Sequence, residues 1–203
     1  PTDARFPVHL ALLHFLNDER APMRDAIKNA LALDPNHPGA WFANGLYHQY
    51  VEPNGNAARL AYQGASQRDP DFAKAWNNLA HVEFELGQHT AAQSAMRLAV
   101  RADPNGAEIR ANYGFILTFL HRLDDAQVAF ERSLELEPGE PFAQLGLGYL
   151  EMFRGNSEAG ITQMLRASAA HPHLPRVSSG LGAAYYQAGR LDAARKSFSD
   201  ARR

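Results

Sequence analysis

Five prolines recur at an almost constant interval along this chain of 203 residues: Pro35, Pro70, Pro104, Pro138 and Pro172. The intervals are 35, 34, 34 and 34 residues. An internal period of this size is typical of proteins that stack one small structural unit many times. Such stacks usually work through their surfaces. The sequence therefore directs the search for function to a partner-binding face before a catalytic pocket.

Each period contains two segments in which small and large residues recur at fixed places. We expect the small residues to let the two segments approach closely as paired helices and the large residues to fill the space between units. Proline then ends each second segment, because it lacks an amide donor and disfavours helical geometry in the residue before it. The small residues are Gly45, Ala80, Gly114, Gly148 and Gly182, and the large ones are Tyr62, Met96, Phe130, Met164 and Phe198.

These positions resemble the tetratricopeptide repeat (TPR) family, whose pattern is Trp-Leu-Gly-Tyr followed by Ala, Phe, Ala and Pro. Tyr113, Gly114 and Phe130 carry that pattern in one of the best-matched units, whereas the first unit is degenerate and has Pro7 in the aromatic position. The resemblance covers nearly the whole chain. It implies an all-α, right-handed solenoid of about six helix-turn-helix units with a concave groove. The predicted units of this single array are residues 4–37, 38–72, 73–106, 107–140, 141–174 and 175–203.

Two departures from the pattern lead to local expectations. One unit has an extra residue within 51–56, so we expect a longer turn between its helices. Gly160 stands where other units have alanine. This costs about 1 kcal/mol of helix propensity, and we expect looser packing around it. Gly87, Gly155 and Gly189 fall between paired helices, where a positive φ is most easily adopted.

Composition excludes several classes of function. The formal net charge is −2 and the isoelectric point is near 6.6, which argues against a nucleic-acid partner. The absence of cysteine excludes disulfides and thiolate chemistry, and it leaves both reducing and oxidising compartments open. No apolar run approaches the roughly 18 residues of a membrane span. Abundant arginine and alanine suit a GC-rich bacterial genome. We expect a soluble protein of the bacterial cytoplasm or periplasm, and the sequence does not choose between them.

Both ends of the chain suggest a piece of a longer polypeptide. It begins with Pro1 rather than methionine. The next closing proline would fall near residue 206, beyond Arg203. One interpretation is that the last helix, which is rich in charged residues, caps the array. The other is that a further unit follows.

The resemblance also implies where a ligand binds, because the first helix of each TPR unit lines the groove. The residues carried over to this surface are rich in aromatic side chains. Exposed apolar strips usually mark interaction sites, and aromatic residues are enriched at binding hot spots. A single aromatic residue at helical spacing is more often core, but so many on one face favour a groove for an amphipathic helix or an extended peptide. The predicted groove residues are Phe42, Leu46, Tyr50, Asn77, Asn78, His81, Phe84, Asn112, Phe115, Phe119, Tyr149, Phe153 and Tyr186.

Asn78 and Asn112 occupy the same position in successive units. In TPR proteins that hold extended peptides, asparagines at this position form a ladder that contacts the ligand backbone, because an amide both donates and accepts. The alternative is that they serve internal packing. The two-carboxylate clamp of chaperone-binding TPR domains is absent, since Phe42, Leu46 and Glu108 stand where basic residues or asparagine are required.

Catalytic and metal-binding patterns are weak. His9 and His14 are five residues apart, not four as in a helical zinc pair. His171 and His173 flank a proline in a predicted turn, and Ser178 has no recognisable base nearby. We therefore predict no catalytic residue, no metal site and no cofactor.

The sequence leads to the hypothesis of a non-enzymatic scaffold that binds a partner protein in its groove. The favoured version is a bacterial assembly or adaptor module of the pilus-biogenesis or envelope-export type. One alternative is a targeting domain of a larger enzyme such as a glycosyltransferase with an N-terminal TPR array. Another is a scaffold that forms homo-oligomers through its groove or its end repeats.

Overall fold

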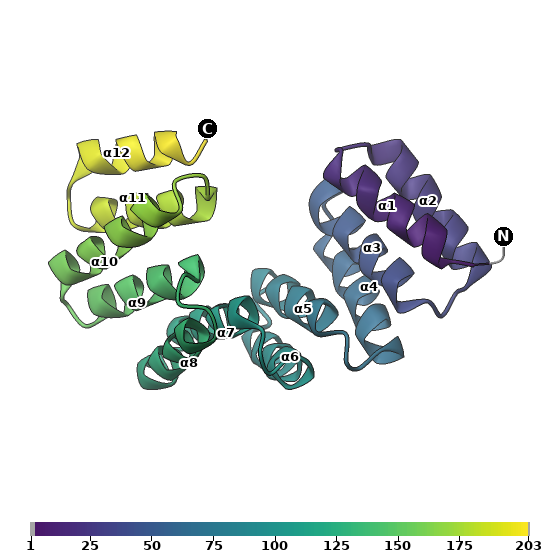
Figure 1. Ribbon diagram of the computed structural model, residues 1–203, viewed down its shortest axis with the longest axis horizontal. Helices are drawn as coiled ribbons and strands as arrows, with labels where there is room; N and C mark the ends of the chain where they lie inside the picture. Colours follow the sequence, from purple (N-terminus) through teal and green to yellow (C-terminus); the bar gives the residue numbers. More distant parts are fainter. Residues whose placement is uncertain (1–2, 203) are drawn as a thin grey trace. The chain divides into compact units, whose positions relative to one another are not determined.

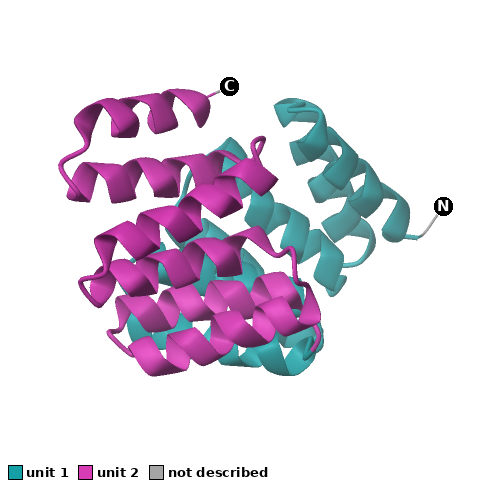
Figure 2. Ribbon diagram, turned by 60° about the vertical axis from the view of Figure 1, so that its left-hand side comes forward, with its two compact units in different colours: residues 1–104 teal, residues 105–203 magenta. Residues whose placement is uncertain are grey.

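The structure is a computed structural model that describes residues 3–202. Over this range all regular secondary structure is helical, with twelve α-helices and one short π-helix (Figure 1). Consecutive helices pair as hairpins, which confirms the predicted all-α solenoid of helix-turn-helix units. The chain divides into two compact units, Pro1–Pro104 and Asn105–Arg203 (Figure 2). That all six repeats form a single array stays a prediction.

Unit 1 contains three hairpins. Its buried residues are mostly alanines and medium-sized apolar side chains, as expected for helices that approach closely. Met23 and Tyr62 are among its largest fully buried side chains. The helices are α1 (Arg5–Leu16), α2 (Arg20–Leu33), α3 (Pro38–Leu46) with η1 (Tyr47–Val51), α4 (Gly55–Arg68), α5 (Ala73–Glu85) and α6 (His89–Ala102).

Unit 2 also contains three hairpins, and α9 packs against both α7 and α8 of the preceding hairpin. Phe130 and Met164 are fully buried within it, as their places in the repeat predict. The helices are α7 (Ala107–Phe119), α8 (Leu123–Leu136), α9 (Pro141–Phe153), α10 (Ser157–Ala170), α11 (Pro175–Gln187) and α12 (Leu191–Asp200).

Positive backbone φ angles occur where the two helices of a hairpin meet. Gly87, Gly155 and Gly189 have φ of 74°, 89° and 73°, which confirms the sequence-based expectation. In two other hairpin turns the equivalent residues are Asp18 and His121, with φ of 54° and 56°. Aspartate tolerates this region better than most residues with a Cβ.

The extra residue of the second hairpin does not lengthen its turn, so that expectation was wrong. The turn holds Glu52–Asn54, which matches the length of the 86–88 turn in the next hairpin. The first helix is longer instead, because α3 and η1 have 9 and 5 residues, against 13 in α5. A π-helical turn takes up one additional residue without breaking the helix, and such turns are frequent at functional sites.

Gly160 does not loosen its surroundings, which also corrects an expectation. A Cβ atom on Gly160 would lie 2.6 Å from the carbonyl oxygen of Gly148 and 2.6 Å from Cγ of Met152. Gly160 is buried, and it faces Gly148 across the α9–α10 contact. The missing side chain lets the two helix backbones come close together. The cost of glycine in helix propensity is therefore offset by the closer packing of α9 against α10.

Candidate functional site

Four aromatic residues of unit 2 form what we call the aromatic strip: Phe115 and Phe119 on α7, and Tyr149 and Phe153 on α9. Each pair is four residues apart, so its members lie on the same face of their helix. The ring centroids of Phe115 and Tyr149 are 6.3 Å apart across the α7–α9 contact. Phe119 and Phe153 are 51% and 54% exposed. The strip therefore has an accessible end and a packed end.

The packed end is held by contacts within unit 2. The Phe115 ring meets the buried Phe130 ring edge-on, with centroids 5.2 Å apart. The Tyr149 hydroxyl donates to the carbonyl oxygen of Gly180 over 3.4 Å. Burial raises the pKa of Tyr149, and the positive charge of Arg176 partly opposes that rise. Phe115 and Tyr149 thus support the strip while they contribute to packing between repeats.

Arg176 adds a positive charge beside the packed end. Its guanidinium carbon lies 4.9 Å from the Phe115 ring centre and 4.7 Å from that of Phe142. Its Nη1 donates to Oδ1 of Asn112 over 3.4 Å. Because cation–π contacts restrict a guanidinium to a few orientations, the aromatic rings fix where this charge is presented. Asn112 itself is buried, and its side-chain oxygen accepts the hydrogen bond that helps to position Arg176.

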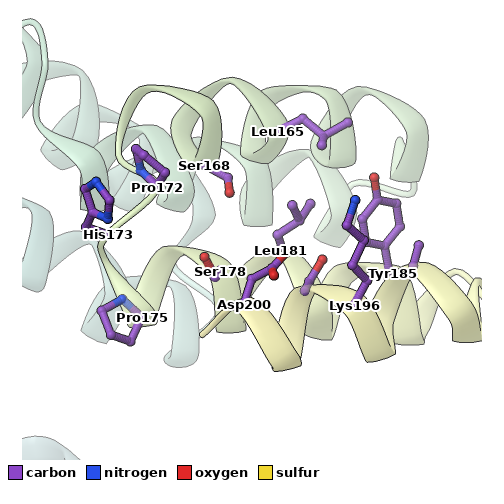
Figure 3. Close-up of a pocket in the computed structure, with 12 residues that line it drawn as sticks. Leu165, Ser168, Pro172, His173, Pro175, Ser178, Leu181, Tyr185, Lys196 and Asp200 are labelled. Carbon is purple, nitrogen blue, oxygen red and sulfur yellow. The ribbon is translucent and has the colours of Figure 1, made fainter. Parts of the chain in front are cut away.

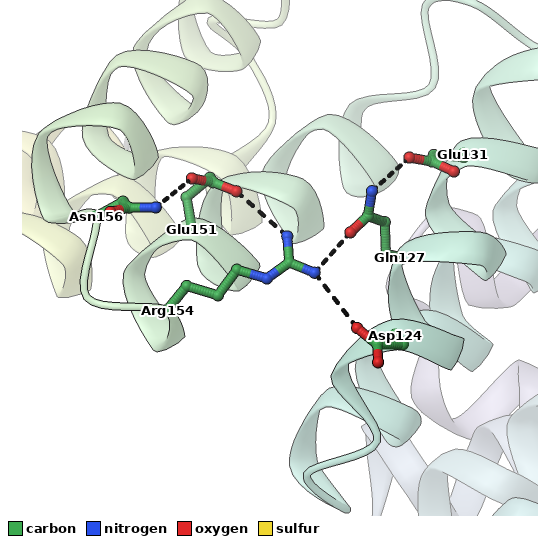
Figure 4. A network of polar contacts seen from close by, with 6 residues as sticks. All are labelled: Asp124, Gln127, Glu131, Glu151, Arg154 and Asn156. Atoms are coloured by element: carbon green, nitrogen blue, oxygen red, sulfur yellow. Dashed lines mark hydrogen bonds and ion pairs between the residues drawn. The ribbon is translucent and has the colours of Figure 1, made fainter.

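A polar network holds the C-terminal end of α9, directly after Phe153 (Figure 4). Nη2 of Arg154 donates to Oε1 of Gln127 over 2.6 Å and lies 3.7 Å from Oδ1 of Asp124. Its Nη1 lies 3.4 Å from Oε1 of Glu151. These contacts join the end of α9 to the first turns of α8, so the two helices run antiparallel. They also hold the exposed Phe153 on a fixed element.

The predicted groove residues of α3 and η1 differ in exposure. Phe42 is half-buried, and its ring centroid lies 4.9 Å from that of Phe72 and 5.7 Å from that of Tyr62. Leu46 is buried in the core of unit 1. Tyr50 lies in the π-helix, is mostly exposed and has its ring 5.9 Å from Phe15.

On α5, the predicted asparagines belong to a network between repeats. Nδ2 of Asn77 donates to Oδ1 of Asn78 over 3.2 Å, and Nδ2 of Asn78 donates to the Tyr62 hydroxyl over 3.3 Å. The Tyr62 hydroxyl donates to Oε1 of Gln49 over 2.7 Å. Burial raises the pKa of Tyr62, so the hydroxyl stays protonated. Asn78 therefore has a structural role, and a ladder that contacts a ligand stays a prediction.

Replacing Tyr62 with phenylalanine is expected to lower the free energy of unfolding by about 1 kcal/mol. The ring is fully buried and keeps its packing, but Gln49 and Asn78 each lose a hydrogen-bond partner. Urea denaturation followed by circular dichroism measures the change. An unchanged midpoint would show that solvent replaces the hydroxyl in this network.

The last two predicted residues of α5 are half-buried and paired locally. His81 lies 3.5 Å from the carboxylate of Glu85, one turn along the helix. The ring of Phe84 lies 5.1 Å from that of His89. Each contact joins residues within one hairpin.

Tyr186 lies apart from the aromatic strip. It is one residue short of the place that Phe119 and Phe153 occupy in their helices. It lines a different pocket with Leu191 and Phe198 at the C-terminal end of unit 2. The sequence could not separate these surfaces, because the repeat positions involved are adjacent.

Sequence reasoning missed a pocket of about 750 Å³ between α10, α11 and α12 (Figure 3). His173, Ser178, Tyr185, Lys196 and Asp200 line it together with apolar residues. The sequence indicates only a turn for His173 and a helix for Ser178, with no signal that the two share a pocket. No hydrogen bond joins these two side chains in the described part of the chain, so the arrangement does not form a nucleophile–base pair.

Metal-binding clusters and membrane-spanning helices are both missing from residues 3–202. Among these residues there is no group of three or more histidine, aspartate or glutamate side chains placed to hold a metal ion. No helix in the same range is both long enough and apolar enough to cross a membrane.

Comparison with known proteins identifies the family to which these helical hairpins belong. The family model described as tetratricopeptide repeat matches residues 54–107 and 145–203, which together make up more than half of the chain. The chain belongs to the TPR family. It is accordingly a TPR scaffold for protein interactions, and members of this family are generally non-catalytic.

Two curated relatives are much longer than this chain. The CTR9 homolog of Arabidopsis thaliana is 26% identical over 148 residues, which cover 71% of this chain and 14% of that protein. The anaphase-promoting complex subunit cut9 of Schizosaccharomyces pombe is 31% identical over 96 residues, covering 47% and 14%. This chain therefore spans about one seventh of the length of each.

A solved structure of similar size shows the same fold. PilW, described as a widely conserved type IV pilus biogenesis factor, superposes with a TM-score of 0.78 at 20% identity. The superposition covers 96% of this chain and 90% of PilW.

Proposed function

We propose that the aromatic strip of unit 2 binds an apolar helix or extended segment of a partner protein. The observation that carries this proposal is the exposure of Phe119 and Phe153 at equivalent places on adjacent helices. Large aromatic rings that are half exposed have a free-energy cost in water, which a partner removes by covering them. Phe115 and Tyr149 at the packed end are already held by contacts within unit 2, so they would lose little conformational entropy on binding.

Arg176 gives the proposed site a polar end. Its guanidinium is oriented by Phe115 and Phe142, and it carries five donors in a rigid arrangement. A ligand that places apolar side chains on the strip and an acceptor group near Arg176 would bind in one direction only. Polar groups at the edge of an apolar surface commonly fix orientation in this way.

The wider role we propose is that of an adaptor in the assembly of a bacterial multiprotein structure, of the kind to which PilW contributes. The likeness of fold to PilW over 96% of this chain motivates this choice. At 20% identity the similarity to PilW shows a shared fold only, so the assembly role is tested by identifying the partner. The molecular mass of the protein in solution distinguishes this adaptor role from self-association through the strip.

The double substitution Phe119→Ser/Phe153→Ser is expected to weaken peptide binding at least about tenfold, because it removes two exposed hot-spot side chains. A displayed library of random peptides is selected on the unmodified chain, and the affinities of the enriched peptides are then measured. We expect these peptides to carry apolar residues three or four positions apart, as in a helix that presents one face.

The matched control is Val128→Ser, which changes a 64% exposed residue on α8 of the same unit. It should leave peptide binding and the melting temperature unchanged. If the Phe119→Ser/Phe153→Ser variant retains every selected peptide with equal affinity, the strip is not the binding surface.

A further inference from the structure

The pocket between α10, α11 and α12 is a space that other hairpins of this chain fill with a large side chain. In the second and third hairpins, Trp41 and Trp76 stand at the fourth position of the first helix. The fifth hairpin has Gln144 there, and its amide donates to the carbonyl oxygen of Pro138 over 3.3 Å. The sixth hairpin has Ser178, which lines the pocket. Serine leaves open the room that an indole or a long amide side chain would occupy.

The two tryptophans show what holds an indole at this position. Nε1 of Trp41 donates to the carbonyl oxygen of Pro35 over 2.7 Å, and Nε1 of Trp76 donates to that of Pro70 over 2.9 Å. Pro172 holds the same place in the loop before the sixth hairpin, and it lines the pocket. No side chain among residues 3–202 donates to its carbonyl oxygen. The residue that accepts from the indole is therefore retained where the indole is missing.

The residue opposite the indole varies between hairpins. A Cβ atom on Gly64 of α4 would lie 2.7 Å from the Trp41 ring, so the ring packs closely against this glycine. The corresponding residue is Leu98 in the third hairpin, which also has a tryptophan, Trp76. In the sixth hairpin it is Asp200. An indole at this position therefore does not require glycine opposite it.

The pocket would stay accessible if further repeats followed α12. Lys196 of α12 lines the pocket and holds the place of Val128 on α8, two repeat lengths earlier. Val128 is 64% exposed although α9 and α10 follow it. Arg132, at the place of Asp200, is exposed as well. The following helix α9 instead covers the side of α8 that carries Phe130.

The charged and polar groups indicate what else a ligand must carry. Figure 3 shows Lys196 and Tyr185 together at the end of the pocket away from Pro172, with Ser178 and Asp200 between the two ends. Among the described residues Lys196 forms no ion pair. An ammonium group and a phenol both donate to a carboxylate, and such charge-assisted hydrogen bonds are strong. Because Asp200 repels an anion, the negative group of a ligand belongs beside Lys196.

We propose that this pocket binds a small molecule that joins an indole ring to a carboxylate. The ring lies beside Ser178 and Leu181, its N–H donates to the carbonyl oxygen of Pro172, and the carboxylate meets Lys196. The pocket, of about 750 Å³, falls within the range of small-molecule sites, and it combines apolar residues with a few polar groups. No residue of the aromatic strip lines it, so the proposal does not depend on the proposed function.

The test titrates indolepropionate into the whole isotope-labelled chain and follows the backbone amide signals by NMR. We expect saturable shifts of the signals of residues around the pocket, with a dissociation constant of about 1 mM or below. The N-methylated form of the ligand lacks the N–H donor, and phenylpropionate has a smaller ring without that donor. Each should bind at least about threefold more weakly.

Two neighbouring residues of α12 test the role of the carboxylate. Lys196→Gln should weaken the binding of indolepropionate about threefold or more at low salt and leave that of the uncharged indolepropionamide unchanged. Arg195→Gln removes the same charge from the next residue, which does not line this pocket, and it should change neither affinity appreciably. Both residues are exposed, so circular dichroism should show folded variants.

Ser178→Trp fills the pocket from within the chain. It restores the residue of the second and third hairpins, so it should abolish binding of indolepropionate and raise the melting temperature by about 2–4 °C. Ser94→Trp, on the exposed side of α6, is the matched control. It should leave both the binding and the melting temperature unchanged. A lower melting temperature for Ser178→Trp would show that the pocket does not accept an indole at this place.

Three further results would overturn the proposal. The first is the absence of saturable shifts around the pocket with indolepropionate. The second is equal affinity for indolepropionate, its N-methylated form and phenylpropionate, because the pocket would then not recognise an indole. The third is tighter binding of a peptide with a C-terminal tryptophan, which would make the end of a partner protein the occupant.

Discussion

Replacing Phe130 with alanine is expected to lower the free energy of unfolding by about 3–5 kcal/mol. The ring is fully buried between Gly114 of α7 and Gly146 of α9. A Cβ atom on Gly114 would lie 2.5 Å from it, so both neighbouring helices are shaped around this one side chain. Alanine would leave a cavity that two glycines cannot fill. The edge-on contact with Phe115 would be lost as well.

Equilibrium denaturation in urea, followed by circular dichroism, measures this loss. Val128→Ala lies two residues away on the exposed side of α8, and it should change the midpoint little. Phe130→Leu should lie between the two, because it retains part of the buried volume. An unchanged midpoint for Phe130→Ala would contradict the packing described for unit 2.

Replacing Gly160 with alanine is expected to destabilise the protein, although alanine is the better helix former. Overpacking costs about 1–3 kcal/mol, whereas the gain in helix propensity is at most about 1 kcal/mol. The new Cβ atom would meet the backbone carbonyl oxygen of Gly148, which cannot turn aside as a flexible side chain can. The helices α9 and α10 would have to separate. We expect a net loss of about 1–2 kcal/mol.

Gly139→Ala is the matched control for this substitution. Gly139 lies between α8 and α9, where an added Cβ atom would have no other atom within 4 Å. The change should be neutral or slightly stabilising, because alanine restricts the unfolded chain. Thermal and urea denaturation of both variants give the comparison. A higher melting temperature for Gly160→Ala would show that helix propensity outweighs the close contact of α9 and α10.

Much of the fold could be predicted because the repeat places the same residue types in the same environments. The pairing of Gly114 with Phe130 follows from a small residue in one helix and a large one in the next, at a fixed distance along the sequence. The left-handed turns at Gly87, Gly155 and Gly189 follow from the position of glycine between two helices. Each of these predictions depends on local sequence and on one neighbouring helix.

The two wrong local expectations concern positions where the same sequence feature is compatible with more than one structure. An extra residue can lengthen a turn or widen a helix, and the π-helix at Tyr47–Val51 is the second solution. The expectation for Gly160 followed from helix propensity, but the effect of this residue depends on Gly148, which lies in the preceding helix. Such a pair is visible only when the register between two helices is known.

The sequence predicts which face of the first helices carries the candidate site, but not which residues of that face are exposed. Leu46 and Phe119 both follow from the groove positions of the family, yet one is buried and the other is half exposed. The difference comes from what the neighbouring repeat places beside each residue. Tyr186 is 66% exposed and lines a pocket with Leu191 and Phe198, apart from the strip, although the family pattern places it in the same groove.

The most direct test of the aromatic strip is an affinity capture from native cell lysate with three forms of the chain. They are the unmodified chain, Phe119→Ser/Phe153→Ser and Val128→Ser, and the captured proteins are identified and quantified by mass spectrometry. We expect one or more proteins that the unmodified chain and Val128→Ser capture equally and that Phe119→Ser/Phe153→Ser loses. Capture of the same proteins in the same amounts by all three forms would contradict a binding role for the strip.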